Sequence, residues 1–258
     1  MEDRLFKAIS LGNTLELKQI LRQNPNIDVN RRNRKGRTPL HEACLLGPPS
    51  IVSLLLARPD INVNIPMTNG ESPFWVTCMF GRTESARLLL RDSRIKTLNS
   101  SDSQGYTALK WASFGGHIGV VESWIASGKE IDLGTPGDFK TDAIGEAKRK
   151  GHVSLAILLE NFRETPEDSR HEVRARTGWY VAPAAEVFAL MVFTSDGLLG
   201  LRQRHLNSAV SKFFSIASQL PMELQMVLCY RLVGSRKCNI PVKDCEVAFK
   251  KLAKKLIR

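Results

Sequence analysis

The sequence predicts an all-α protein, a solenoid of stacked two-helix units with hairpin-like connectors that is capped by a C-terminal helical domain. Three observations predict this class. A pattern of capping, apolar and small residues recurs about every 35 residues through the first 164 positions. An apolar stripe at helical spacing follows each recurrence. The period stops after residue 164, where apolar segments led by proline begin. We therefore place one domain at 1–164 and a second at 165–258.

Each unit begins with a residue whose side-chain oxygen can cap a helix. These residues lie at intervals of 35, 34, 35 and 35, and they are Asp3, Thr38, Ser72, Thr107 and Asp142. Such a side chain accepts hydrogen bonds from backbone N–H groups two or three residues further on. We therefore expect a first helix to start at each position.

Nine residues after each cap stands a glycine. The five glycines are Gly12, Gly47, Gly81, Gly116 and Gly151. Glycine adopts the left-handed conformation that ends a short helix at no steric cost. The residue five positions after each cap is small, so that neighbouring helices can approach: Ala8, Ala43, Thr77, Ala112 and Ala147. We expect each first helix to end at its glycine.

Apolar residues at positions five, eight and nine after each glycine, with Glu160 in the fifth unit as the exception, predict a second helix with one buried face. Trp124 lies on this stripe, and we expect it in the core. Polar turn segments such as 28–36 and 62–70 separate the units. The expected units span about 1–33, 34–67, 68–102, 103–137 and 138–164.

The second unit opens with Thr38-Pro39-Leu40-His41, which resembles the T-P-L-H start of the ankyrin repeat family. The other units keep the glycine and the small residue but depart from this start, as in Thr107-Ala108-Leu109-Lys110. The resemblance covers five units over 1–164. It implies an array without catalytic machinery or cofactor, which recognises proteins through its hairpin tips and the concave face of its first helices.

The tips and the groove supply the candidate partner-binding residues. The first tip carries five cations within seven residues: Arg31, Arg32, Arg34, Lys35 and Arg37. We expect this cluster to dock an acidic protein, with a nuclear-localisation or nucleic-acid patch and a merely solvated loop as alternatives. Nucleic acid is disfavoured because no aromatic residues interleave the cations. The next two tips add these candidates: Pro66, Met67, Asp102 and Gln104.

In the groove, we expect the residue before each small residue to face outward. These residues are Glu42, Val76, Trp111 and Glu146. Trp111 and Phe114, together with Met79 and Phe80, are candidate apolar anchors for a partner. The alternative is that adjacent helices or the C-terminal region cover these side chains.

Enzymatic chemistry and metal binding are not expected. His41, His117 and His152 belong to the repeat pattern, and no catalytic or metal-ligand spacing is present. Five cysteines without CxxC spacing favour a reducing compartment, cytoplasmic or nuclear, and the N-terminus does not resemble a secretion signal. No apolar run approaches the ~20 residues of a membrane helix. We expect a monomer without metal or cofactor.

The C-terminal third is expected to be helical from Thr165-Pro166 onward, with further helical segments at 183–194, 206–220, 221–233 and 241–257. The chain carries 37 basic and 26 acidic residues, a net charge of +11. Part of this excess lies on the last segment, a basic amphipathic helix. We interpret it as a core stripe with a solvated lysine face, and contact with an anionic membrane or an acidic partner is the alternative.

Residues 220–228, Leu-Pro-Met-Glu-Leu-Gln-Met-Val-Leu, resemble the opening of F-box and F-box-like segments, which recruit the adaptor of a cullin-type ubiquitin ligase. This resemblance nominates six adaptor-binding residues: Leu220, Pro221, Glu223, Leu224, Val227 and Leu228. The tryptophan-bearing second half of an F-box is missing, and a capped core helix has the same pattern. The first hypothesis is therefore a protein-interaction module. The alternatives are a substrate-recruiting ligase subunit with its adaptor contact at 220–232, and a basic nucleic-acid or membrane-surface binder.

Overall fold

A computed structural model describes residues 2–179, 187–190 and 222–232 of the protein. The chain divides into two compact parts, residues 1–173 and residues 174–258, and each is described by itself. Helices are the regular elements throughout the described ranges, where no β-strand is present and a single antiparallel bridge joins Ser101 to Thr107. The predicted all-α class is confirmed.

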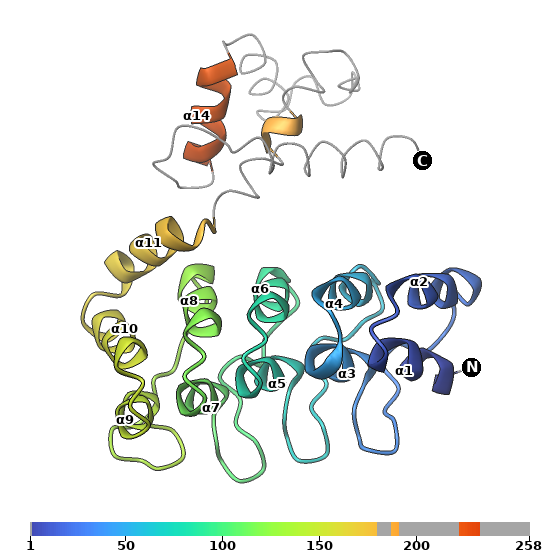
Figure 1. The fold of residues 1–258 in the computed structure, drawn as a ribbon, viewed down its shortest axis with the longest axis horizontal. Coiled ribbons are helices and arrows are strands. Elements are labelled where there is room, and N and C mark those ends of the chain that lie inside the picture. Colours follow the sequence, from blue (N-terminus) through green and yellow to red (C-terminus); the bar gives the residue numbers. More distant parts are fainter. Residues whose placement is uncertain (1, 180–186, 191–221, 233–258) are drawn as a thin grey trace. The chain divides into compact units, whose positions relative to one another are not determined.

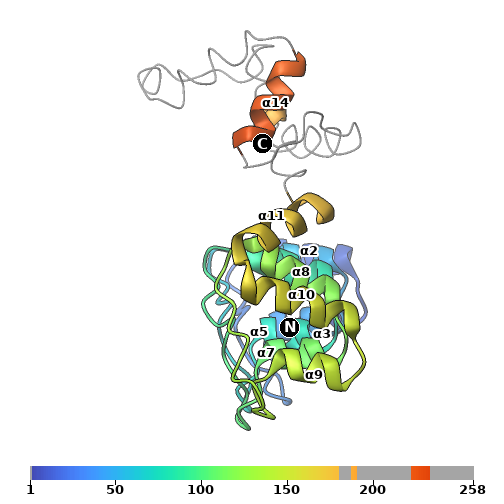
Figure 2. The same cartoon turned by 90° about the vertical axis from the view of Figure 1, so that its left-hand side faces the viewer.

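Five antiparallel helix pairs form the first part (Figure 1). The first helices are α1 (Glu2–Ser10), α3 (Pro39–Leu46), α5 (Pro73–Met79), α7 (Ala108–Phe114) and α9 (Ala143–Arg149). The second helices are α2 (Thr14–Gln23), α4 (Pro49–Leu56), α6 (Thr83–Arg91), α8 (Ile118–Ser127) and α10 (Val153–Glu164). Each first helix packs on the next first helix and each second helix on the next second helix, so the pairs stack into two layers. Figure 2 looks along this stack.

Side-chain caps start the first helices of the second to fifth repeats, as the sequence predicts. Thr38 and His41 form a reciprocal capping box, and Ser72 accepts a hydrogen bond from the backbone N–H of Trp75. Thr107 and Asp142 cap α7 and α9 in the same way. The expectation for the first repeat is wrong, because α1 already includes Glu2 and Asp3 therefore lies inside the helix.

Four of the five repeat glycines have the expected left-handed backbone, with φ between 64° and 76°. Gly47 is the exception, since its φ of −79° and ψ of 155° are extended. Pro48 follows it, and a proline ring disfavours helical conformations of the residue before it. The local Gly-Pro sequence therefore overrides the pattern of the repeat.

The predicted stripe on the second helices forms the core between the two layers. Leu17, Val52, Leu89 and Trp124 have no exposed surface. The Trp124 ring meets the Phe74 ring edge to face, with 4.8 Å between ring centroids. Edge-to-face packing stabilises aromatic pairs beyond the area that they bury. Trp124 is thus a core residue, as expected.

Asparagine side chains join consecutive connectors. Asn30 donates to the carbonyl oxygen of Asp60 at 2.7 Å and accepts from the backbone N–H of Asn62 at 2.8 Å. Asn64 and Asn99 make the equivalent pair of contacts one and two repeats later. These bonds replace strand pairing and hold the connectors side by side, beyond the layer of first helices (Figure 1).

In the C-terminal region, the predicted helix after Thr165 is α11 (Pro166–Thr177) and the segment predicted at 221–233 contains α14 (Met222–Leu232). Residues 187–190 are also helical. The segments predicted at 206–220 and 241–257, and most of 183–194, lie outside the described residues. The proposed domain boundary at 164 differs from the division between Val173 and Arg174.

Candidate functional site

The first connector presents a cationic tip. The side-chain oxygen of Asn33 accepts from the backbone N–H groups of Lys35 at 2.9 Å and Arg37 at 3.1 Å, which shapes the turn. Four cationic side chains on this turn are exposed: Arg31, Arg32, Arg34 and Lys35. A turn closed by its own asparagine holds these cations close together.

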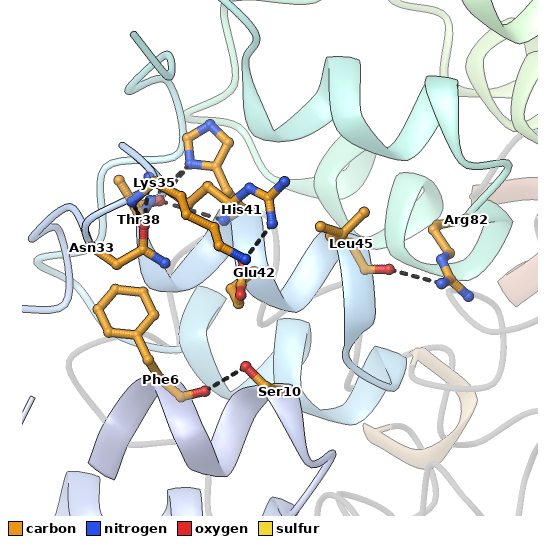
Figure 3. Close-up of polar contacts among 10 residues, drawn as sticks. Phe6, Ser10, Asn33, Lys35, Thr38, His41, Glu42, Leu45 and Arg82 are labelled. Carbon is orange, nitrogen blue, oxygen red and sulfur yellow. Dashed lines mark hydrogen bonds and ion pairs between the residues drawn. The ribbon is translucent and has the colours of Figure 1, made fainter. Parts of the chain in front are cut away.

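The cationic tip borders a hollow of about 860 Å³, which we call the cationic hollow. Helix α1 contributes Asp3 and Phe6 to it and α3 contributes Glu42, while the other lining residues come from the connector: Arg31, Arg32, Asn33, Arg34 and Lys35. Figure 3 shows Phe6, Asn33, Lys35 and Glu42 in this region. Four cations face two carboxylates here, so the local field attracts negative charge.

Arg37 differs from the other four cations. It is half-buried, and its Nη1 donates to Glu42 Oε2 at 3.3 Å. Glu42 is itself only 7% exposed, so the ion pair neutralises a carboxylate that borders the hollow. Arg37 therefore acts mainly by balancing Glu42, and it is less accessible than the other residues of the cluster.

A second, smaller hollow of about 230 Å³ lies between α3, the second connector and α5, and we call it the apolar pocket. Its apolar lining residues are Leu45, Met67, Val76, Met79 and Phe80. Its polar lining residues are Arg37, His41, Asn69 and Glu71. Burial raises the pKa of the Glu71 carboxyl, although a hydrogen bond from Asn69 opposes this shift. The pocket can receive an apolar side chain, with polar groups around it.

The prediction that four groove positions face outward is wrong for three of them. Glu42, Val76 and Glu146 are 7%, 3% and 4% exposed. Glu42 is covered through its ion pair with Arg37, and Glu146 contacts both Lys110 and Arg149. Trp111 is half-buried. The exposed apolar residues of the groove lie instead at the ends of the first helices: Leu46, Phe80 and Phe114.

Trp111 belongs to an aromatic cluster that the sequence analysis did not recognise. Its ring centroid lies 5.8 Å from those of Trp75 and Tyr106 and 5.4 Å from that of Phe114. Tyr106 in turn contacts Phe139, a residue of the next connector. The sequence does carry one signal of this cluster, since two successive connectors each contain an aromatic residue, Tyr106 and Phe139. These contacts occupy much of the Trp111 ring, while Phe114 keeps 38% of its surface exposed.

Lys110 is buried inside this cluster, although the sequence places it at the motif histidine position. Its Nζ lies 3.9 Å from Glu146 Oε2 and over the rings of Tyr106 and Phe139, at 4.6 and 4.4 Å from their centroids. Burial lowers the pKa of Lys110, and the Glu146 carboxylate counteracts that shift. Lys110 therefore holds two connectors and a helix together.

The candidates on the second and third tips differ in accessibility. Pro66 and Gln104 are exposed, whereas Met67 is 8% exposed and lies against the apolar pocket. Asp102 is half-buried, and its carboxylate accepts from the backbone N–H groups of Gln104 and Tyr106, both at 2.9 Å. Asp102 therefore shapes the third turn, as Asn33 shapes the first.

Helix α14 carries part of the F-box-like segment. Leu224 is 51% exposed, and Val227 and Leu228 are half-buried. Gln225 and Cys229 form the buried side of the helix. Leu220 and Pro221 lie outside the described residues, as does the side chain of Glu223.

The described parts of the chain contain no group of three or more histidine, cysteine, aspartate or glutamate side chains able to hold a metal ion. They also contain no helix with the length and apolar character needed to cross a bilayer. Cys44 and Cys78 are fully buried, and burial raises the pKa of both thiols well above the ordinary value. A protonated, inaccessible thiol is a poor nucleophile.

Two family models match the array. One, described as ankyrin repeats (many copies), matches residues 5–56, and the other, described as ankyrin repeats (3 copies), matches residues 60–135. Residues 5–135 are ankyrin repeats. The matches cover the helix pairs from α1–α2 to α7–α8, and a fifth pair, α9–α10, stacks on α7–α8 in the same way. Ankyrin repeats are generally protein-interaction modules, so a protein partner is implied for this chain.

Proposed function

We propose that the ankyrin array is a non-enzymatic interaction module that binds an acidic partner protein through its first tip and its groove. The observation that carries the proposal is the cationic hollow, where four exposed cations face only two carboxylates. One of these carboxylates, Glu42, is already paired with Arg37. The excess positive charge favours an acidic surface and increases its rate of association.

The surroundings of the hollow favour a protein over a nucleic acid. Phe6 is the aromatic residue in the lining of the cationic hollow, and it is half-buried on α1. Proteins that bind single-stranded nucleic acids instead stack successive bases on exposed aromatic rings. The tip is a short turn, and no base-reading module was recognised in the sequence. The cationic side chains that line the hollow can therefore pair with acidic side chains of a partner protein.

Proximity labelling in cells tests the proposal. The full chain is compared with the double variant Arg34→Glu/Lys35→Glu and with the control Lys18→Glu/Arg22→Glu. The control changes two exposed cations on α2 and alters the net charge equally. We expect acidic proteins labelled by the wild type to lose about tenfold in signal with the first variant and to be retained with the control. Equal labelling by all three chains, or equal loss with both variants, contradicts the proposal.

Helix α14 supports a second candidate function, recruitment of the adaptor of a cullin-type ubiquitin ligase. The supporting observation is the exposed Leu224 beside half-buried Val227 and Leu228, since an amphipathic helix binds a groove through such a face. We expect the full chain to capture the purified adaptor and Leu224→Asp to abolish capture without changing the helical circular-dichroism signal. Absence of capture by the wild-type chain refutes this candidate.

A further inference from the structure

The cationic hollow and the apolar pocket meet on one helix. Helix α3 supplies Glu42 to the hollow and supplies His41 and Leu45 to the pocket. The Arg37–Glu42 ion pair lies between them, because Arg37 lines the pocket and Glu42 lines the hollow. Figure 3 shows Glu42 and Leu45 in succession along α3, together with Lys35 and Phe6, which line the hollow with Glu42. The two hollows therefore form adjoining parts of one surface.

The two parts differ in chemistry. The hollow is lined by four exposed cations, whereas five of the nine residues that line the pocket are apolar. Phe80 is 46% exposed at the pocket, so a ligand can reach an aromatic surface there. Arg82 donates to the carbonyl oxygen of Leu45 at 2.8 Å and thereby ties α3 to the start of α6. This bond holds α3 against the turn between α5 and α6, which carries Phe80 of the pocket.

We propose that this surface binds a short acidic segment of a partner protein that carries one bulky apolar residue, with the acidic side chains in the cationic hollow and the apolar side chain in the apolar pocket. The inference rests on the proposed function and specifies its partner. Charge complementarity selects the occupant, because acidic side chains match the cations of the hollow, and an apolar side chain matches the lining next to Phe80.

The geometry also sets the order and spacing of the two features. The hollow lies between α1 and α3 and the pocket between α3 and α5, so the two are about one interhelical spacing, ~8–10 Å, apart. An extended chain advances ~3.3 Å per residue, so the acidic and apolar residues of the segment are about two to four residues apart. The Glu71 carboxylate lines the pocket. It repels acidic residues there, so the acidic side chains lie toward the first repeat.

Peptide selection on the full chain tests this inference. A phage-displayed library of random dodecapeptides serves as the probe, and enriched peptides are resynthesised with a fluorescent label for anisotropy measurements. We expect the enriched peptides to share at least two acidic residues within about four positions of a leucine, isoleucine, methionine, phenylalanine or tryptophan. Enrichment of peptides without an acidic excess, or of acidic peptides without an apolar residue, overturns the inference.

Matched variants locate the bound peptide. Phe80→Ala and Leu46→Ala remove apolar side chains of similar exposure, 46% and 49%, at the same position of adjacent repeats, but only Phe80 lines the pocket. We expect Phe80→Ala to weaken binding about tenfold and Leu46→Ala less than about twofold. Arg34→Glu/Lys35→Glu should weaken it at least tenfold, and Lys18→Glu/Arg22→Glu should not. Equal effects within either pair overturn the inference.

Failure of this inference can be distinguished from failure of the proposed function. If no peptide is enriched while labelling of acidic proteins in cells still depends on Arg34 and Lys35, the partner uses the tip without the pocket. That result overturns the inference and leaves the proposed function intact. If cellular labelling is also independent of these cations, the proposed function fails as well.

Discussion

At the scale of single residues, His41 shows how one side chain joins two repeats. The backbone N–H of Thr38 donates to its Nδ1 at 3.2 Å, so Nδ1 carries no proton. The Nε2–H therefore donates to the backbone oxygen of Glu71 in the next connector, at 3.1 Å. The neutral imidazole thus satisfies both partners. The pKa of His41 is lowered to about 4, chiefly because the side chain is buried. The hydrogen bond to Glu71 raises this pKa, whereas the nearby charges of Arg32 and Arg37 lower it.

This shift makes stability depend on pH. The pKa of His41 is lower in the folded chain, about 4, than the ordinary value of 6.5, so the unfolded chain binds more protons between these values. The stabilisation is complete above pH 6.5 and is lost as the pH falls toward 4. We expect the titration of His41 alone to lower the free energy of unfolding by on the order of 3 kcal/mol between pH 6.5 and 4. Urea unfolding at a series of pH values measures it.

The control for the pH experiment is His41→Gln, which removes the titrating group. The variant should be less stable than the wild type at pH 7, since it loses the bond from Nε2 of His41 to the backbone oxygen of Glu71, but its stability should fall less steeply between pH 6.5 and 4. Identical slopes for the two proteins would show that other groups dominate the pH dependence.

At the scale of elements, the side chain that follows the repeat glycine in the third, fourth and fifth repeats bonds back to the preceding repeat. Arg82 reaches the carbonyl oxygen of Leu45, and His117 and His152 reach those of Met79 and Phe114, both at 3.1 Å. The histidine rings lie against the glycines of the preceding repeats, where a Cβ would meet them. Glycine is thus needed for this stacking as well as for the end of the helix.

We predict that Gly81→Ala is strongly destabilising. Gly81 has a φ of 64°, and an added Cβ would overlap the imidazole of His117. The left-handed backbone alone costs an alanine about 1–2 kcal/mol, and displacement of His117 also removes its bond to Met79. Thermal unfolding of the full chain should show that the variant has lost about 3 kcal/mol of its free energy of unfolding.

Gly137→Ala is the matched control. Gly137 also has a positive φ, 81°, but a Cβ there meets nothing within 4 Å. This change should cost only about 1–2 kcal/mol. If the two variants are equally stable, the packing of His117 on Gly81 contributes nothing measurable.

At the scale of the whole molecule, the ankyrin array has its own core and nearest-neighbour packing throughout. Such arrays are stabilised by contacts between adjacent repeats and need no long-range closure. Helix α11 follows α10 directly, and the Arg170 guanidinium lies 5.4 Å from the centroid of the Phe162 ring. This contact places residues after 164 in the same packing as the last repeat.

We predict that residues 1–179 form an independently folded fragment, which unfolds cooperatively and is helical by circular dichroism. A fragment that ends at residue 164 lacks the Arg170–Phe162 contact and should be less stable by about 1 kcal/mol in urea unfolding. Equal stability of the two fragments would support the boundary at 164. A fragment 1–179 without cooperative unfolding would show that the array depends on residues beyond it.

The fold was largely predictable because its signals are local. A capping oxygen at Thr107 or Asp142 and a glycine such as Gly116 each act on residues within one helix turn. Gly47 was mispredicted for an equally local reason, the following proline. The candidate surface was less predictable: the cationic tip is visible in the sequence, whereas the apolar pocket joins residues of two helices and a connector.

The sequence by itself determined the repeat, its register, its core stripe and the charge of the first tip, because each depends on spacing along one chain segment. Only the tertiary structure decided which groove residues a partner can reach. Lys110 covers Glu146, and Trp75 packs against the ring of Trp111. Phe80 remains exposed beside a pocket. Accessibility is set largely by side chains about one repeat away, and a pattern within a single repeat carries no information about them.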